Sequence, residues 1–538
     1  MTGPIASTDK DQALRLSIAL LALPLVLQAS VVAGFALQAS LGVGTLLVAL
    51  TAYLVVCWQL FAPQRDLKGV AITVLIVAAS FAVALFFQDF DYDSRAYHLP
   101  ASVMMLEGWN PLYQTVPPEN PDARFPGLQI VTFAKGQWYI NAAAMLTFQS
   151  IEAGKFTHGL YLAASFLTGF VVLRRKLDGR TALPMLLAAG IALNPVALAQ
   201  MPINYLDGAV ASLLTLLLLC FYGLVDGPSK SLTLIAVLST ILLASAKTSG
   251  LAFAAVCWAV FGLYVLLFRR EEALSWIKPV SVMGLAIVLL NVNPYVTNAM
   301  DKGNPVYPLL EKQSFLKRPY FEGFNRFERF AVSYSSATSF MPEQSESALD
   351  HWRNPLSPRN VMRAMYPQNL ARTLGALGSW FGIGLLLSLF LIFRIGRPEA
   401  VILVMIFLTT FSHDEGWHSR YCPQVWIVPW IIAAGVLRKT QREWTLPVLL
   451  TLSITSASCA ALLFTYPNQI VVSKQYFEVR EAYLEGETTF EEGFEPYHST
   501  FNSRPEVFRW VELKRLELSG NLATRLLNED QNGAKEAE

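Results

Sequence analysis

Residues 208–225 have the sequence GAVASLLTLLLLCFYGLV, and residues 71–87 have the sequence AITVLIVAASFAVALFF. Neither stretch contains a charged residue, and each is long enough for a helix to cross the roughly 30 Å hydrocarbon layer of a bilayer. Similar stretches recur along the 538 residues, of which 54% are apolar and only 15% charged. The sequence therefore predicts an all-α polytopic membrane protein, and it excludes a soluble enzyme, a nucleic-acid-binding protein and a disordered scaffold.

The apolar stretches predict thirteen transmembrane helices, at 13–35, 41–61, 69–87, 155–173, 182–199, 208–225, 231–246, 250–268, 277–293, 373–393, 399–412, 421–437 and 445–465. The positive-inside rule orients them, because cytoplasmic loops carry an excess of Lys and Arg. With the N-terminus inside, every cytoplasmic turn is basic: Arg65 and Lys68; Arg174, Arg175, Lys176 and Arg180; Lys230; Arg269 and Arg270; Arg394 and Arg397; Arg438, Lys439 and Arg442.

This topology divides the chain into a transmembrane domain, 1–465, and a C-terminal tail, 466–538, on the outer side of the membrane. Two long loops, 88–154 and 294–372, lie on the same side as the tail. Of the 65 residues from Lys474 to Glu538, 22 are charged. We therefore expect a small water-soluble tail, and the spacing of its apolar residues predicts a helix within 505–528.

The first outer loop opens with three alternating carboxylates, in the sequence QDFDYDSRAYHLP at 88–100. Asp89, Asp91 and Asp93 lie close enough to raise one another's pKa, which suits a general base that takes a proton from a hydroxyl group. Two alternatives stay open at this point. The acids can form a solvated collar beyond a helix end, or Asp91, Asp93 and His98 can bind a divalent cation such as Mg²⁺ or Mn²⁺.

The remainder of this loop predicts two short helices. Residues 94–113 have the pattern of an amphipathic helix, which Gly108 and Asn110-Pro111 end, and residues 125–150 predict a second helix interrupted near Lys135. Two helices lying along the membrane interface would hold the acidic cluster against the bilayer surface.

Polar residues also mark the outer ends of later spans. These segments are NYLDG at 204–208, SAKTSG at 245–250, NPY at 293–295 with GNPVYP at 303–308, and WHSRYCPQ at 417–424. Together with DSRAYHLP at 93–100, they resemble in type and order the segments of uncharacterised bacterial members of the GT-C superfamily of membrane glycosyltransferases. Protein O-mannosyltransferases and lipid A aminoarabinose transferases are relatives in that superfamily.

The resemblance implies a GT-C-like fold and an inverting hexosyl- or pentosyltransferase. Such an enzyme moves a sugar from a polyprenyl-phosphate donor to a hydroxyl of a glycolipid, polysaccharide or protein. It would lie in the bacterial inner membrane, with its active site on the periplasmic face. By this match Asp93 takes the place of the catalytic aspartate, with Asp91 as its neighbour or alternate.

The resemblance also gives the other polar residues roles in substrate binding. Asp207 would contact the substrate or a metal, so that Asp91, Asp93 and Asp207 are the candidate ligands if a divalent cation takes part. Arg420 and Lys247 lie where a lipid phosphate would be, and a guanidinium or an ammonium stabilises the departing phosphate. The remaining predicted substrate contacts are Tyr97, His98 and Tyr421.

Alternatives remain for these residues and for the function. Lys247 and Arg420 can instead extend to the interface only as anchors. An O-antigen ligase or polymerase-like enzyme is a second function, against which the acidic first loop argues. A transporter or flippase of lipid-linked sugars is a third, and the nearly uncharged spans argue against it.

The topology predicts the outcome of reporter fusions. Fusions after residues 110, 340 and 500 should report the outer side, and fusions near 66, 177 and 440 the cytoplasm, because every basic turn is then inside. A cytoplasmic signal at 500 would remove one span and contradict the thirteen-helix topology.

Overall fold

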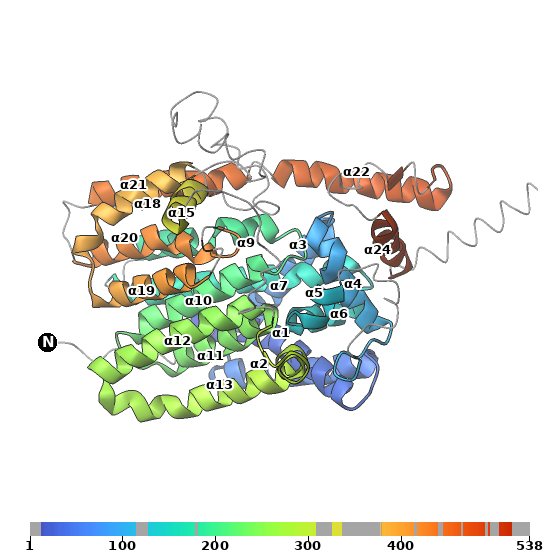
Figure 1. The fold of residues 1–538 in the computed structure, drawn as a ribbon, viewed down its shortest axis with the longest axis horizontal. Coiled ribbons are helices and arrows are strands. Elements are labelled where there is room, and N and C mark those ends of the chain that lie inside the picture. The colour runs from blue at the N-terminus through green and yellow to red at the C-terminus, as the bar shows by residue number, and fades with distance from the viewer. Residues whose placement is uncertain are drawn as a thin grey trace, which may run out of the picture.

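The computed structural model describes residues 12–114, 127–177, 181–307, 325–335, 377, 379–413, 416, 418–439, 445–463, 466–489, 493–494 and 505–518. The regular structure within these ranges is entirely helical, which confirms the predicted all-α class. The long helices run side by side (Figure 1), and the short helices α4, α5 and α6 lie together at one end of this bundle. We call this end the loop end.

Seven helices of the described chain are long and apolar enough to cross a membrane, as expected for a helical membrane protein. They are α1 (Gln12–Ala36), α2 (Val43–Phe61), α3 (Leu67–Phe86), α7 (Phe156–Lys176), α10 (Asp207–Leu224), α12 (Thr248–Phe268) and α13 (Ile277–Leu290). Three of these seven include a short adjoining 3₁₀ segment. Large apolar side chains on α2, α3 and α13 remain exposed, such as Leu47, Leu75 and Leu285, and a lipid environment would cover them.

Shorter helices cover the other predicted spans. They are α8 (Ala182–Ala192), α9 (Pro195–Gln200), α11 (Lys230–Ala246), α18 (Ser379–Phe390), α19 (Arg397–Phe411), α20 (Val428–Lys439) and α21 (Thr445–Leu463). A helix therefore lies on each of the thirteen predicted stretches, and the crossing of the membrane by all thirteen stays a prediction.

The predicted span 182–199 differs from the structure, because it is broken between α8 and α9. Pro195 has no N–H to continue a helix, and the Asn194 side chain caps the new helix by accepting a hydrogen bond from the Val196 N–H at 3.0 Å. Asn194 also donates from Nδ2 to the Pro423 carbonyl at 2.9 Å. The break therefore connects α9 to the segment that precedes α20.

The short helices of the first outer loop are η3 (Ser94–His98), α4 (Leu99–Leu106), α5 (Gly127–Thr132), α6 (Gly136–Phe148) and η4 (Ile151–Lys155). The two predicted helical regions are thus present. However, every residue of α6 from Gly136 to Met145 is buried, because α6 packs against α1, α4 and α11. This helix is part of the protein core, whereas we expected it to lie on the bilayer surface.

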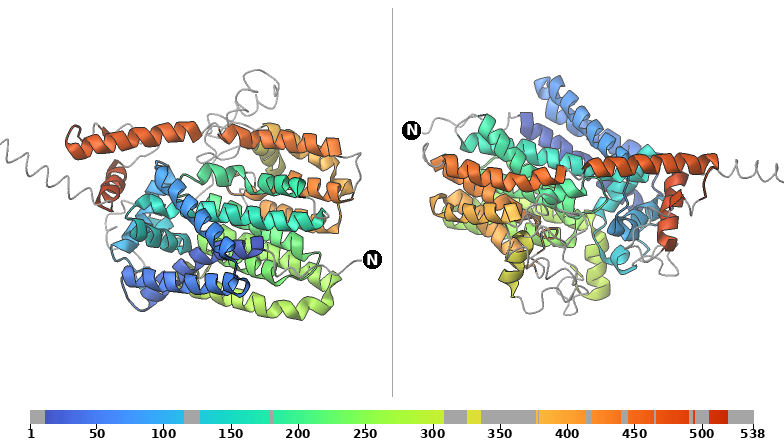
Figure 2. Two further views of the ribbon diagram at one scale, coloured as in Figure 1. Left: turned by 180° about the vertical axis from the view of Figure 1, so that it is seen from behind. Right: turned by 90° about the horizontal axis from the view of Figure 1, so that it is seen from above.

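The described part of loop 294–372 begins within η6 (Val292–Val296) and includes α14 (Thr297–Lys302) and α15 (Arg326–Ser335). In the tail, α22 (Tyr466–Glu485) extends beyond the loop end, and α24 (Pro505–Leu518) lies beside α4 (Figures 1 and 2). The helix predicted within 505–528 is therefore present to residue 518, and 519–528 lie outside the described residues.

Two glycines of α12 provide a matched test of the packing between α11 and α12. A Cβ on Gly250 would come within 2.4 Å of the Leu243 carbonyl oxygen, whereas a Cβ on Gly262 would meet no atom within 4 Å. Gly250→Ala should therefore destabilise the protein by about 1–3 kcal/mol, since a backbone carbonyl cannot rotate away. Gly262→Ala should leave the midpoint of thermal unfolding in detergent unchanged or slightly raised. Equal midpoints for the two variants would contradict this packing.

Candidate functional site

Four charged side chains from distant segments meet at the loop end. Asp93 directly precedes η3, Asp207 begins α10, Lys247 lies between α11 and α12, and Arg420 lies in the turn before α20. Arg420 donates from Nε to Asp207 Oδ2 at 2.6 Å and from Nη2 to Asp93 Oδ2. Lys247 Nζ pairs with the second oxygen of Asp207. We call these four residues the charged cluster.

The charged cluster is largely enclosed by protein. The side chains of Asp207 and Arg420 are 4% and 9% exposed, while those of Asp93 and Lys247 are 22% and 28% exposed. Burial alone would lower the pKa of Arg420, but the carboxylates of Asp207 and Asp93 outweigh it and hold this pKa well above its usual value. The guanidinium is therefore a permanent cation, and Asp93 and Lys247 are the more exposed members of the charged cluster.

Aromatic rings surround both cations. The Arg420 guanidinium lies over the ring of Tyr205, 4.5 Å from its centroid, and Lys247 Nζ lies 4.7 Å from the centroid of Tyr421. These are cation–π distances. The Tyr205 hydroxyl also accepts a hydrogen bond from the Asp93 N–H at 3.0 Å. Tyr205 was not among the predicted site residues, although it lies in the NYLDG segment that led to Asp207.

The predicted residues Tyr97 and His98 lie beside the charged cluster. Trp138 donates from Nε1 to His98 Nδ1 at 2.9 Å, so the proton of neutral His98 is on Nε2. Burial lowers the pKa of His98 to about 3, and the nearby carboxylates of Asp93 and Asp207 offset only part of this effect. His98 is therefore neutral near pH 7 and can donate one hydrogen bond, but it cannot supply a positive charge to a phosphate.

The other two acids of the first loop occupy different positions. Asp89 is fully buried, and its carboxylate accepts hydrogen bonds from the N–H of Asn204 at 2.6 Å, from Asn204 Nδ2 at 2.9 Å and from the N–H of Asp91 at 3.0 Å. Asp89 thus ties the loop to the turn before α10. Asp91 is 5% exposed. Burial raises the pKa of Tyr205, and the negative charges of Asp93 and Asp91 raise this pKa further. Asp93 is the acid that contacts Arg420.

The turn that carries Arg420 contains a further buried aromatic group. His418 stacks on Tyr421 with 4.2 Å between ring centroids, and burial together with the Arg420 charge lowers its pKa well below the usual value. Asp414, Glu415 and Trp417, which crowd this turn in the sequence, lie outside the described residues.

Two of the candidate metal ligands are paired with a cation of the protein itself. Asp93 and Asp207 both bind the Arg420 guanidinium, and participation of a divalent cation stays a prediction. Within the ranges that the structure describes, no group of three His, Cys, Asp or Glu residues is placed to hold a metal ion.

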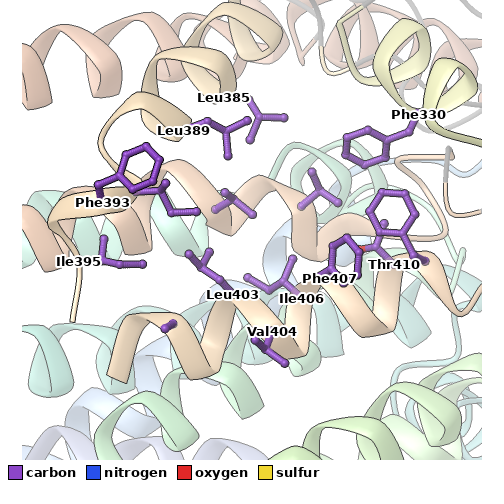
Figure 3. Close-up of a pocket in the computed structure, with 15 residues that line it drawn as sticks. Phe330, Leu385, Leu389, Phe393, Ile395, Leu403, Val404, Ile406, Phe407 and Thr410 are labelled. Carbon is purple, nitrogen blue, oxygen red and sulfur yellow. The ribbon is translucent and has the colours of Figure 1, made fainter. Parts of the chain in front are cut away.

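An apolar groove of about 690 Å³ lies between α18 and α19 (Figure 3). Phe330, Phe407 and Thr410 lie at one end of the groove, and Phe393 and Ile395 lie at the other. The described lining residues come from α15, α18, η8 (Ile392–Arg394), the turn at Ile395, α19, η9 (Pro423–Ile427) and the start of α20. Thr410 is the one polar residue among those described. Gln424, four residues after Arg420, donates to Thr410 Oγ1 at 3.2 Å and so fixes the turn to this end of the groove.

The charged cluster predicts a specific loss of stability. Asp207→Asn removes one charge from a buried network and leaves Lys247 and Arg420 less well compensated, which should cost about 3–5 kcal/mol. Glu517→Gln removes the same charge from a side chain that is 55% exposed and should cost at most about 1 kcal/mol. Thermal unfolding in detergent measures both values, and similar losses for the two variants would contradict the network.

No protein-family model, curated protein or solved structure matches this chain. The resemblance to GT-C glycosyltransferases therefore stays a prediction, and the geometry of the site is what supports a function.

Proposed function

We propose that this protein is a membrane glycosyltransferase that moves a sugar from a polyprenyl-phosphate donor to a hydroxyl group of an acceptor. The observation that carries the proposal is the position of Arg420. It lies between Asp93 and Asp207, and the following residues Gln424 and Val425 contact the end of an apolar groove. A cation for phosphate, a carboxylate for proton transfer and a groove for an isoprenoid chain are the three parts that such a reaction needs.

Arg420 retains hydrogen-bonding capacity for a phosphate. Its Nε and Nη2 bind Asp207 and Asp93, while Nη1 has no hydrogen bond to the described part of the chain. Lys247 is 28% exposed and uses one of its three N–H groups for Asp207. A phosphate that accepts from Arg420 Nη1 and Lys247 Nζ would therefore be held without loss of the Arg420–Asp207 pair.

The groove suits the hydrocarbon part of the donor. The wall that α19 forms from Ala400 to Phe411 is about 16 Å long, since an α-helix rises 1.5 Å per residue. That length accommodates several isoprene units next to the phosphate. Because the lining is almost wholly apolar, the chain would contact a surface as apolar as the lipid it leaves.

The proposed reaction uses these groups in order. Asp93 accepts the proton of the acceptor hydroxyl as its oxygen attacks the anomeric carbon. The bond from this carbon to the phosphate oxygen breaks on the opposite side, which inverts the configuration. Arg420 and Lys247 stabilise the negative charge that develops on the leaving polyprenyl phosphate.

The pair between Asp93 and Arg420 gives the phosphate a second role. A phosphate at Arg420 Nη1 shares the guanidinium charge with the Asp93 carboxylate on Nη2 and repels that carboxylate, so arrival of the donor weakens this pair. Asp93 then has an oxygen available for the acceptor hydroxyl. We further propose that the site faces the periplasm from the bacterial inner membrane, as the distribution of Lys and Arg predicts. No step in this proposal uses a metal ion.

The reaction is tested by comparing cells with and without the gene. Mass spectrometry of surface glycolipids, polysaccharides and glycoproteins should show the loss of one sugar from one acceptor in the deletion strain, and the intact gene should restore it. Unchanged glycans together with unequal distribution of a lipid-linked sugar across the membrane would overturn the proposal in favour of a flippase.

Asp93→Asn should separate catalysis from donor binding. Transfer should fall by about 10²–10⁴-fold, as is usual when a general base is lost. Binding of undecaprenyl phosphate to the purified protein should be unchanged or tighter, because asparagine no longer competes for Arg420. If Asp93→Asn retained activity and Asp91→Asn lost it, the assignment of the base would be wrong.

Arg420 variants test the phosphate site. Arg420→Ala should weaken binding of undecaprenyl phosphate by about ten- to a hundredfold, since a charge-assisted hydrogen bond contributes about 1.5–3 kcal/mol. Arg420→Lys keeps the charge without the planar fork and should recover only part of the affinity. Arg394→Ala, at the opposite end of the groove, is the matched control and should bind like the parent. Equal affinities in all three variants would locate the phosphate elsewhere.

A further inference from the structure

A second set of charged side chains joins the C-terminal helix α24 to the first outer loop. Arg95 Nη2 pairs with Glu512 Oε1 at 3.2 Å, and Arg515 Nη2 pairs with Glu152 Oε1 at 2.7 Å. Within α24, Arg515 also binds Glu512 at 2.9 Å. None of these four side chains is more than 4% exposed. We call them the tail network.

The tail network converges on the backbone of Asp89. Its carbonyl oxygen accepts from Arg515 Nη2 at 3.2 Å and from Arg95 Nε at 3.3 Å, and its N–H donates to Glu152 Oε1 at 3.4 Å. The Asp89 side chain binds Asn204, which directly precedes Tyr205. Asp89 therefore connects the tail to the segment that carries Asp93 and to the segment that carries Asp207.

The helix α22 contacts the same segment from another side. Ser473 Oγ accepts from the N–H of Gln88 at 3.2 Å, and the ring of Tyr476 packs on Phe90 with 5.3 Å between centroids. The Tyr476 hydroxyl donates to Glu512 Oε2 at 2.6 Å. The two tail helices thus hold residues 88–90, which lie three to five positions before Asp93, the first member of the charged cluster.

Buried ion pairs of this kind add little net stability relative to apolar packing, but separating the partners is costly because it leaves a buried charge uncompensated. A tail that served only as a soluble appendage would present its charges to water. Here Glu512 and Arg515, three residues apart on one helix, direct their charges into the protein instead. The tail network is therefore suited to fixing the position of residues 88–98.

We propose that α24 is a positioning element of the site, and that Glu512 and Arg515 are positioning residues that hold Asp93 in reach of Arg420. The effect on catalysis rests on the proposed function. The effect on the loop does not, because it concerns only whether the tail orders residues 88–98.

Hydrogen exchange of the full-length protein tests the structural part. In Glu512→Gln and Arg515→Ala, amides of 88–98 should exchange at least about tenfold faster than in the parent, while amides of α7 and α10 keep their protection. Lys514→Gln is the matched control on the same helix, because Lys514 pairs with Glu107 and Glu517 instead. In Lys514→Gln the amides of 88–98 should exchange at the same rate as in the parent. Unchanged exchange of 88–98 in both network variants would overturn the proposal.

Two milder variants keep the test decisive if Glu512→Gln fails to fold. Tyr476→Phe removes only the hydroxyl that donates to Glu512, and Arg515→Lys retains the charge. Both should show a smaller increase in exchange of 88–98 than Arg515→Ala. An increase spread evenly over α7, α10 and 88–98 would indicate general destabilisation and would also overturn the proposal.

Transfer kinetics test the catalytic part. In Arg515→Ala, kcat should fall about tenfold or more while the affinity for undecaprenyl phosphate stays within about threefold, and Arg515→Lys should recover most of kcat. A loss confined to carrier affinity would contradict a positioning role. If the parent transfers no sugar, the proposed function fails, and the exchange experiment still decides whether the tail orders the loop.

Discussion

The bridge that Arg420 forms between Asp93 and Asp207 is the interaction on which the site depends. A guanidinium that is only 9% exposed needs anionic partners, because burial of an uncompensated charge is very unfavourable. The two carboxylates come from segments more than 110 residues apart, and Lys247 neutralises the remaining oxygen of Asp207. Pairing of these charges therefore brings together the ends of α10, α11 and α12 and the turn before α20. The aromatic rings of Tyr205 and Tyr421 enclose both cations.

Much of this arrangement could be predicted from the sequence, for a simple reason. Ionisable residues are excluded from apolar spans, so the few that remain gather at span ends, and those at one end face the same side of the membrane. Asp93, Asp207, Lys247 and Arg420 were all chosen on this basis together with the resemblance, and they are in contact. Helices were located equally well, since uninterrupted apolar stretches leave little choice of structure.

The features that the sequence did not predict depend on contacts between distant residues. The burial of α6 follows from its packing on α1, α4 and α11, and nothing in the residues 136–148 alone indicates that both faces are covered. The role of Asp89 depends on Asn204, and the role of Glu512 depends on Arg95. A charged tail has the same composition whether its charges face water or partners, so composition predicted a solvated appendage. The break at Asn194 is easier to predict from the sequence, because Asn-Pro is a recognised helix-start signal.

The groove between α18 and α19 opens on the surface of the bundle, where Phe393, Phe407 and Val404 are about half exposed or more. Under the proposed function, the hydrocarbon chain of the donor would therefore enter from the side without leaving the lipid phase. For such a ligand the concentration that determines binding is its mole fraction in the membrane or micelle. The volume of the surrounding water does not enter. Apparent affinity would then decrease as more lipid or detergent dilutes the ligand within the membrane or micelle, even when the amounts of protein and ligand per millilitre stay constant.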